Sequence, residues 1–347
     1  MENVTFKCEI ITPMFMYGAD GRTPEIRPSE FKGMMRFWWR AVNNYNNHQD
    51  LRKEEDKIFG GTDVEKASEV KLIISPKSIR ISRNNIKVQY NLKPGFKGDK
   101  DSGILYLFYI NLLQGGKPFI EPNSTLELHL LFPRNSSQKF ADEIFSTLWL
   151  AIYLGGFGSR SRRCGGNLIV RESHYSNGLD FLIPNKSELM SWYRENLRII
   201  MRDTNDSKNL DYSNIIAPQI YVLESLASNS WKDAINKIGS SYLNFRKRKR
   251  FPERLTFGLP ITGKNSADVI VNGEKGRRAS PLVFHIIKTR DNIYVPIIVK
   301  LGGKFLPEHA DIEINYRRKR WRIKGKQLED EIIEEFISGL QARRIEL

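Results

Sequence analysis

The order of strands and helices predicted in the first half of the chain most constrains what it can fold into. Residues 4–11 alternate apolar and polar side chains, which predicts a half-buried strand. Apolar residues at helical spacing then predict a helix that is capped by Ser29 and ends near Asn44. Strands are also predicted at residues 70–75, 103–113, 125–132 and 167–171, and a second helix at 138–154. With a glycine-rich loop before its last strand, this order predicts a split βαβ, ferredoxin-like domain of the α+β class.

The pattern changes after about residue 176, where a second α+β unit is predicted. Its helices are expected at residues 187–201, 231–245 and 327–341, and its strands at 256–261, 281–288 and 293–301. A chain of 347 residues fits roughly two domains, since about 150 residues make one. We therefore expect domains at residues 1–176 and 177–347.

The net charge of the chain limits the classes of partner that it is expected to bind. The chain has 55 Lys and Arg against 40 Asp and Glu, a net charge of +15, which favours nucleic acid, an anionic membrane surface or acidic proteins. Neither a signal peptide nor an apolar run of about 18 residues is present, so we expect a cytoplasmic protein that neither is exported nor spans a membrane, and we expect no membrane partner. Cys8 and Cys164 are far apart, which argues against a disulfide framework and structural zinc.

The loop at residues 155–166 combines five glycines with Arg160, Arg162 and Arg163. Glycines let backbone N–H groups approach a phosphate, and arginine supplies charge-assisted donors to phosphate oxygens. The loop matches neither the P-loop pattern nor the G-x-G-x-x-G fingerprint, so it does not indicate nucleotide hydrolysis. The alternative is a helix-to-strand connection with a solvated basic tip.

A basic stripe on the first helix is the second candidate. Lys32, Arg36 and Arg40 lie on one side without an acidic residue four positions later, and Trp39 beside them offers a stacking face. In a split βαβ fold the loop at 155–166 can approach this helix and merge the two basic patches. A solvated helix face is the competing interpretation.

Other basic residues complete the candidate surface. The runs at residues 246–250 and 317–322, the second containing Trp321, are interpreted mainly as a source of non-specific attraction. Arg277 and Arg278 directly precede the strand predicted at 281–288, and we expect them either to contact phosphate or to cap the sheet that contains this strand. The candidate nucleic-acid-binding residues are Lys32, Arg36, Trp39, Arg40, Gly156, Gly158, Ser159, Arg160, Ser161, Arg162, Arg163, Arg277 and Arg278.

Catalytic signals are weak. The five histidines are scattered with no metal-ligand spacing, and no nucleophile motif is present, so we expect no catalytic residue, metal, cofactor or small-molecule substrate. Asp20 in the loop after the first strand is the best acidic candidate, but its flanking glycine favours a turn.

Four segments together resemble one known family. They are IITPMFMYGADGRTPEIRPSEFKGMMRFWWRA at residues 10–41, KIFGG at 57–61, GGFGSRSRRCGGNL at 155–168 and RRASPL at 277–282. In this order they resemble the RAMP superfamily of CRISPR proteins, and within it the first subunit of type III-B (Cmr) effector complexes. Cys164 departs from the pattern, where glycine or another small residue is expected.

The resemblance implies two tandem ferredoxin-like, RRM-like domains with the glycine-rich loop near the first helix. It also implies a non-catalytic, RNA-binding role in antiviral defence, near the 3′ end of the guide (CRISPR) RNA and the complementary target RNA, beside other RAMP subunits. In such complexes a repeated backbone subunit cleaves the target with an aspartate in a loop comparable to that of Asp20. Three alternatives stay open: a metal-dependent ribonuclease using Asp20, a guide-processing nuclease using His48 as general base, and a scaffold for acidic proteins.

Overall fold

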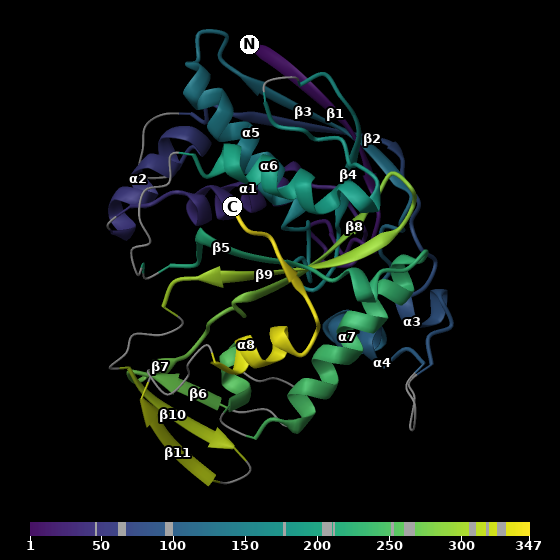
Figure 1. Ribbon diagram of the computed structural model, residues 1–347, viewed down its shortest axis with the longest axis vertical. Coiled ribbons are helices and arrows are strands. Elements are labelled where there is room, and N and C mark those ends of the chain that lie inside the picture. The colour runs from purple at the N-terminus through teal and green to yellow at the C-terminus, as the bar shows by residue number, and fades with distance from the viewer. Residues whose placement is uncertain are drawn as a thin grey trace.

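A computed structural model of residues 1–347 gives the fold (Figure 1). It describes residues 1–45, 47–61, 67–93, 100–175, 178–202, 210, 212–250, 253–259, 268–304, 310–316, 319–324 and 331–347. The chain forms helices and antiparallel sheets, so the predicted mixture of α and β structure is confirmed.

The first sheet has the strand order β2-β3-β1-β4, and every neighbouring pair is antiparallel. Its strands are β1 (Glu2–Ile10), β2 (Lys71–Ser78), β3 (Ser124–Phe132) and β4 (Leu168–Ser173). Two helices cover it, α1 (Pro28–Val42) and α5 (Gln138–Tyr153). Burial alternates along β3, as expected for a strand with one face against helices. Phe145 of α5 packs against Phe6 of β1, with ring centroids 6.2 Å apart.

The second sheet has the order β12-β5-β9-β8, also antiparallel throughout. Its strands are β5 (Asn214–Val222), β8 (Leu282–Lys288), β9 (Tyr294–Gly302) and β12 (Arg343–Arg344), accompanied by helices α7 (Trp231–Arg248) and α8 (Glu331–Ser338). In both sheets the fourth strand along the chain borders the first, and the third lies between the first and the second. All seven residues of β8 are buried. Tyr242 of α7 packs on Phe284 of β8, while Asn167 of the first half accepts a hydrogen bond from the Ile286 amide.

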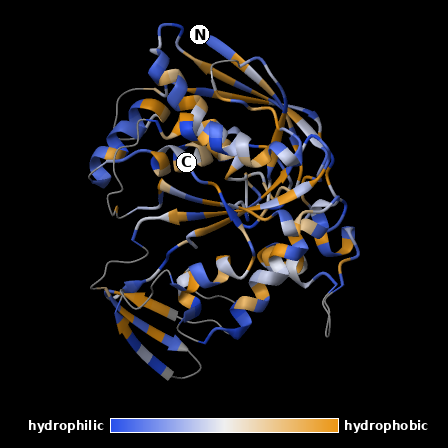
Figure 2. Ribbon diagram, in the orientation of Figure 1, coloured by the Kyte–Doolittle hydropathy of each residue, from blue (hydrophilic) through white to orange (hydrophobic). Residues whose placement is uncertain are grey.

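The third sheet is small and has the order β11-β10-β6-β7. Its strands are β6 (Asp268–Val271), β7 (Glu274–Lys275), β10 (Asp311–Tyr316) and β11 (Lys319–Lys324). Figure 2 shows apolar residues alternating with polar ones along this sheet. A separate hydrophobic cluster packs here, made of Leu255, Leu259, Val269, Ile312 and Ile314. β11 contains the part of the basic run from residue 319 onward, and residues 317–318 lie outside the described residues.

Shorter elements connect the sheets. They are α2 (His48–Phe59), α3 (Ile86–Gln89), α4 (Ser102–Leu107), α6 (Leu189–Ile200), and the 3-10 segments η1 (Tyr109–Gly115), η2 (Lys186–Glu188), η3 (Glu224–Leu226) and η4 (Glu253–Phe257). α6 packs on α5. The Tyr193 hydroxyl donates to the Tyr153 carbonyl at 3.0 Å, and the ring centroids of Trp192 and Trp149 lie 5.1 Å apart. No helix among the described residues is both long and apolar enough to cross a membrane.

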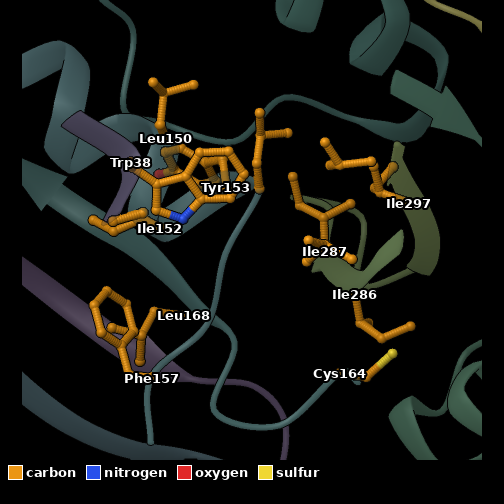
Figure 3. Close-up of a cluster of buried hydrophobic side chains, with 14 of the residues drawn as sticks. Trp38, Leu150, Ile152, Tyr153, Phe157, Cys164, Leu168, Ile286, Ile287 and Ile297 are labelled. Carbon is orange, nitrogen blue, oxygen red and sulfur yellow. The ribbon is translucent and has the colours of Figure 1, made fainter. Parts of the chain in front are cut away.

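Both halves contribute to one apolar core (Figure 3). Trp38 and Tyr153 come from α1 and α5, Ile286 and Ile297 come from β8 and β9, and Cys164 of the glycine-rich loop lies between the halves, beside Ile286. The loop is therefore a packed part of the interior. The division at residue 176 stays a prediction.

Three local predictions are wrong. Residues 103–113 form α4 and η1 instead of a strand, because Asn236 of α7 accepts hydrogen bonds from the Gly103 and Ile104 amides at 3.0 and 3.2 Å and caps the helix. The strand expected at 256–261 is replaced in its described part by η4 and a turn at Gly258, where φ is +126°. Ser29 does not cap α1, since that helix begins at Pro28, whose missing N–H suits the first helical position.

Two further helices differ from expectation. The final helix, predicted at 327–341, is described only as α8, and residues 325–330 lie outside the described residues. α2 was not predicted, although the Asn47 side chain caps it by accepting from the Asp50 amide at 2.8 Å.

Candidate nucleic-acid interface

The backbone of the glycine-rich loop at residues 155–166 is held by hydrogen bonds within the loop and to neighbouring segments. Six backbone N–H groups of the loop donate to carbonyl oxygens, namely those of Phe157, Ser159, Arg163, Cys164, Gly165 and Gly166. The acceptors are carbonyls of the loop itself, of Pro13 and Phe15 after β1, and of Phe284 in β8. The prediction that loop amides cradle a phosphate is therefore wrong for these six, because each amide already has a partner.

Close backbone packing explains the glycines. A Cβ on Gly166 would lie 2.0 Å from the Phe157 carbonyl oxygen, and one on Gly156 would lie 2.6 Å from the Gly165 carbonyl oxygen. Gly158 has a φ of +85°, which glycine adopts without strain. Cys164 has a φ of +64°, so the residue that departs from the family pattern occupies a position that favours glycine.

The three loop arginines reach carbonyl groups of distant segments. Arg160 Nε donates to the Leu107 carbonyl at 2.6 Å, Arg162 Nη1 to the Ser280 carbonyl at 2.8 Å, and Arg163 Nη1 to the Leu282 carbonyl at 2.7 Å. Burial, reinforced by the charge of Arg163, lowers the pKa of Arg160 to about 10 and that of Arg162 to about 10. The side chains of all three arginines and of Ser161 are half-buried, whereas Ser159 is exposed. The three arginines therefore do not form the solvated basic tip of the alternative interpretation.

Two of these arginines line a cavity of about 290 Å³, here called the arginine cavity. Its charged lining residues are Arg160, Arg163, Arg246 and Arg278, and its tyrosines are Tyr106, Tyr109 and Tyr242. None of the described residues that line it is an aspartate or glutamate. Four arginines thus line one small space whose described walls contain no Asp or Glu.

Arg246 is the member that sequence reasoning missed. The sequence places it in a basic run that is expected to be solvated, but it lies in the last turn of α7, where its Nη1 donates to the Tyr106 hydroxyl at 2.6 Å. Its guanidinium lies 5.5 Å from the ring centres of Tyr242 and Phe257, a cation–π arrangement. The spacing of the helix could have indicated this position, because Arg246 follows the buried Tyr242 by four residues and therefore lies on the same face of α7.

Arg277 and Arg278 differ in their surroundings. Arg277 is exposed. Arg278 is half-buried at the arginine cavity, and its Nη2 donates to the Lys304 carbonyl at 2.9 Å. Burial lowers the pKa of Arg278.

The basic stripe on α1 is largely neutralised, contrary to expectation. Arg36 pairs with Glu55 at 2.5 Å and with Asp56 at 2.7 Å, and Arg40 pairs with Glu55 at 2.6 Å. Both carboxylates come from α2, so they are not visible in the spacing of α1 itself. Lys32 Nζ donates to the Ser68 hydroxyl at 2.7 Å.

Trp39 presents no open stacking face, because it is buried and its Nε1 donates to Glu143 of α5 at 2.5 Å. Arg36 and Arg40 line a cavity of about 510 Å³ that shares no described residue with the arginine cavity. The loop does reach α1, with Phe157 stacked on Phe31 at 4.2 Å and the Arg162 guanidinium 4.7 Å from the ring centre of Phe37, but both contacts are made to aromatic rings of α1 and not to its cations. The expected merger of the two basic patches is therefore wrong.

The catalytic candidates have no supporting groups in the described chain. Asp20 Oδ1 accepts from the Arg22 and Thr23 amides at 2.8 and 2.9 Å, the geometry of an Asx turn. The bonds from Thr23 and Arg22 lower the pKa of Asp20 to about 2. His48 is exposed at the start of α2, 6.1 Å from the ring centre of Tyr212. Within the described ranges no three His, Cys, Asp or Glu side chains gather to bind a metal ion.

Comparison with known proteins shows similarity to the RAMP superfamily and to subunits of CRISPR Cmr systems. The model of the RAMP superfamily matches residues 7–169. CRISPR system Cmr subunit Cmr1-1 of Pyrococcus furiosus is 30% identical over 324 residues, which span 87% of this chain and 88% of that protein. Cmr subunit Cmr1-2 of the same organism is 31% identical over 186 residues, or 49% of this chain and 96% of that protein.

Solved structures share the fold. The crystal structure of apo Cmr1 from Pyrococcus furiosus has a TM-score of 0.68 at 23% identity and covers 99% of both chains. A chain in the cryo-EM structure of a type III-B Cmr-β complex bound to cognate target RNA has a TM-score of 0.56 at 15% identity, covering 97% of this chain and 98% of that chain.

Proposed function

The chain belongs to the RAMP superfamily as a Cmr1-type subunit of a type III-B (Cmr) CRISPR system, and we propose that it binds RNA in this effector complex without cleaving it. The observation that carries the proposal is the arginine cavity. Four arginines line it, and no Asp or Glu is among its described lining residues. Arginine is suited to phosphate because its planar fork of donors matches phosphate oxygens.

We assign the guide RNA and its complementary target RNA as ligands, near the guide 3′ end, with other Cmr subunits as partners in antiviral defence. A similar chain occurs in a Cmr-β structure bound to cognate target RNA, which supports RNA as a partner. The shared strand order of the first two sheets favours two tandem ferredoxin-like units, and we place their boundary at residue 176. Of the candidate contacts, Arg160, Arg163 and Arg278 have the strongest support, since they line the arginine cavity.

Salt dependence tests the proposal. Each phosphate that the protein holds makes the logarithm of the affinity for single-stranded RNA fall with the logarithm of salt at a slope of about −0.7. One phosphate on the arginine cavity therefore corresponds to a loss of about threefold between 50 and 200 mM salt, and every further phosphate contact multiplies this loss, which fluorescence anisotropy of a labelled RNA measures. Affinity that does not change over this range contradicts the proposal. Failure to bind any RNA, together with purification free of nucleic acid, would support the scaffold alternative.

Nuclease activity is tested in parallel. Asp20 Oδ1 already accepts two backbone hydrogen bonds and Oδ2 accepts one from the Thr23 hydroxyl, and in the described part of the chain no group of three His, Cys, Asp or Glu side chains includes Asp20 as a ligand for a metal ion. We therefore expect labelled guide and target RNA to stay intact with the purified protein, with or without divalent metal. Products that disappear in Asp20→Asn would identify a metal-dependent nuclease, and products lost in His48→Asn would identify the metal-independent alternative.

A further inference from the structure

The size of the arginine cavity limits what can enter it. Its volume of about 290 Å³ lies at the lower end of ligand pockets, which span about 300–1,000 Å³. A continuous run of RNA does not fit such a space, whereas one nucleotide is of the right order. The cavity therefore differs from an open groove that follows a backbone over many phosphates.

The charge in the walls identifies the chemistry of the ligand. Arg163 stacks on Tyr242 and Phe284 at 5.3 and 5.0 Å from the ring centres, and its Nη2 donates to the Tyr242 hydroxyl at 3.4 Å. The Nε of Arg246 is buried and has no partner among the described residues. Besides burial, the positive charge of Arg163 lowers the pKa of the neighbouring Arg160, so an anion that accepts several N–H donors stabilises this pair of like charges. A phosphate has this property.

Two apolar side chains at the edge of the cavity supply a surface for a base. Tyr109 is 43% exposed and Ile110 is 50% exposed, although both line the cavity from η1. Unpaired RNA bases are commonly held by stacking on aromatic side chains while arginines hold the phosphate. The Tyr106 hydroxyl, which accepts from Arg246, keeps its own O–H as a donor for a polar edge.

We propose that the arginine cavity takes a single unpaired nucleotide of the bound RNA, with its phosphate on the arginines and its base against Tyr109. The inference rests on the proposed function and deepens it, because it distinguishes an unpaired nucleotide from duplex RNA. The competing interpretation is that the arginines only tie the halves together through carbonyl groups. That interpretation assigns no role to the exposed ring of Tyr109, and it leaves the buried Nε of Arg246 without a partner.

The test compares three RNAs of the same sequence by fluorescence anisotropy with the full-length protein. They are a blunt duplex, the same duplex with one central unpaired nucleotide, and the labelled single strand. We expect the bulged duplex to bind about 10-fold more tightly than the blunt one. Tyr109→Ala should weaken binding of the bulged duplex and single strand by about 5- to 100-fold, the range for loss of one stacked base, and leave the blunt duplex unchanged.

Arg246→Gln provides a second variant, and Arg248→Gln is its matched control. Both remove one positive charge from the last turn of α7, but Arg248 is exposed and does not line the cavity. Arg246→Gln should reduce the preference for the bulged duplex, whereas Arg248→Gln should weaken all three RNAs to the same small extent. Thermal unfolding reports whether Arg246→Gln stays folded, and Tyr109→Ala keeps the test valid if it does not.

The outcomes separate the two proposals. If the protein binds no RNA, the proposed function fails. If it binds all three RNAs with equal affinity, or if Tyr109→Ala weakens them equally, RNA binding stands and the single-nucleotide site is overturned. Equal effects of Arg246→Gln and Arg248→Gln would likewise overturn it.

Discussion

Acid is expected to destabilise the protein through one buried histidine. The side chain of His285 in β8 is fully buried, and its Nδ1 lies 2.7 Å from the carbonyl oxygen of Gly155, the first residue of the glycine-rich loop. Its Nε2 has no hydrogen-bond partner among the described residues. Burial lowers the pKa of His285 to about 4, although the bond to Gly155 opposes this shift. The folded protein therefore holds the neutral imidazole.

The two pKa values set the pH range and the magnitude. In the unfolded chain His285 has a pKa of about 6.5, above its folded value, so the unfolded state binds the proton more readily. The stabilisation from the neutral histidine is fully present above about pH 6.5, and it is lost as the pH falls from 6.5 towards 4. A gap of about 2.5 between the pKa values corresponds to about 3 kcal/mol of unfolding free energy.

Urea unfolding at several values between pH 7.5 and 4.5 measures this loss. His285→Asn keeps an amide donor for the Gly155 carbonyl and removes the titrating ring, so its stability should decline by about 2 to 3 kcal/mol less over this range than that of the unmodified protein. His174→Asn is the matched control, because His174 is exposed on the first half, and it should follow the unmodified protein. Identical pH dependence in the unmodified protein and His285→Asn would refute the reasoning.

The spacing of apolar residues and the residue types within short segments account for the elements that were predicted correctly. β1, α1, β3, α5, β4, β8 and β9 all lie close to their expected positions. In α1 and β3 the apolar residues lie on the face that is buried, whereas β8 and β9 are buried on both faces and are predicted from their residue types and their flanking Gly and Pro. Such information is contained in neighbouring residues, so no tertiary contact is needed to recover it.

Contacts between distant residues explain what was missed. α4 is capped by Asn236, more than 130 positions away, so its apolar sequence alone reads as a strand. The acids that neutralise Arg36 belong to another helix. The spacing of α1 could therefore show its cations but not their partners.

The candidate site was only partly visible for the same reason. Arg160 and Arg163 stood out because glycines surround them in the sequence, and both line the arginine cavity. Arg246 and Tyr109 join them only after α7 and η1 pack beside the loop. The net charge of +15 alone does not show where the cations lie, whereas in the fold four arginines from three separate segments line one cavity.

Two substitutions test the packing of the loop and the role of α1. Gly166→Ala should cost at least about 2 kcal/mol more than Gly178→Ala in urea unfolding, because both positions have positive φ but only at Gly166 does the added Cβ clash, with the Phe157 carbonyl. Equal costs would show that the loop backbone relaxes. Arg36→Ala should lower stability by about 1 to 3 kcal/mol, because it removes a partner of the buried Glu55 carboxylate. Since the charge of Arg36 is already paired, affinity for single-stranded RNA should change by less than about twofold in the anisotropy assay. A loss of about 10-fold or more in folded Arg36→Ala would instead place RNA phosphates on α1, where the carboxylate of Glu55 would have to give way to them.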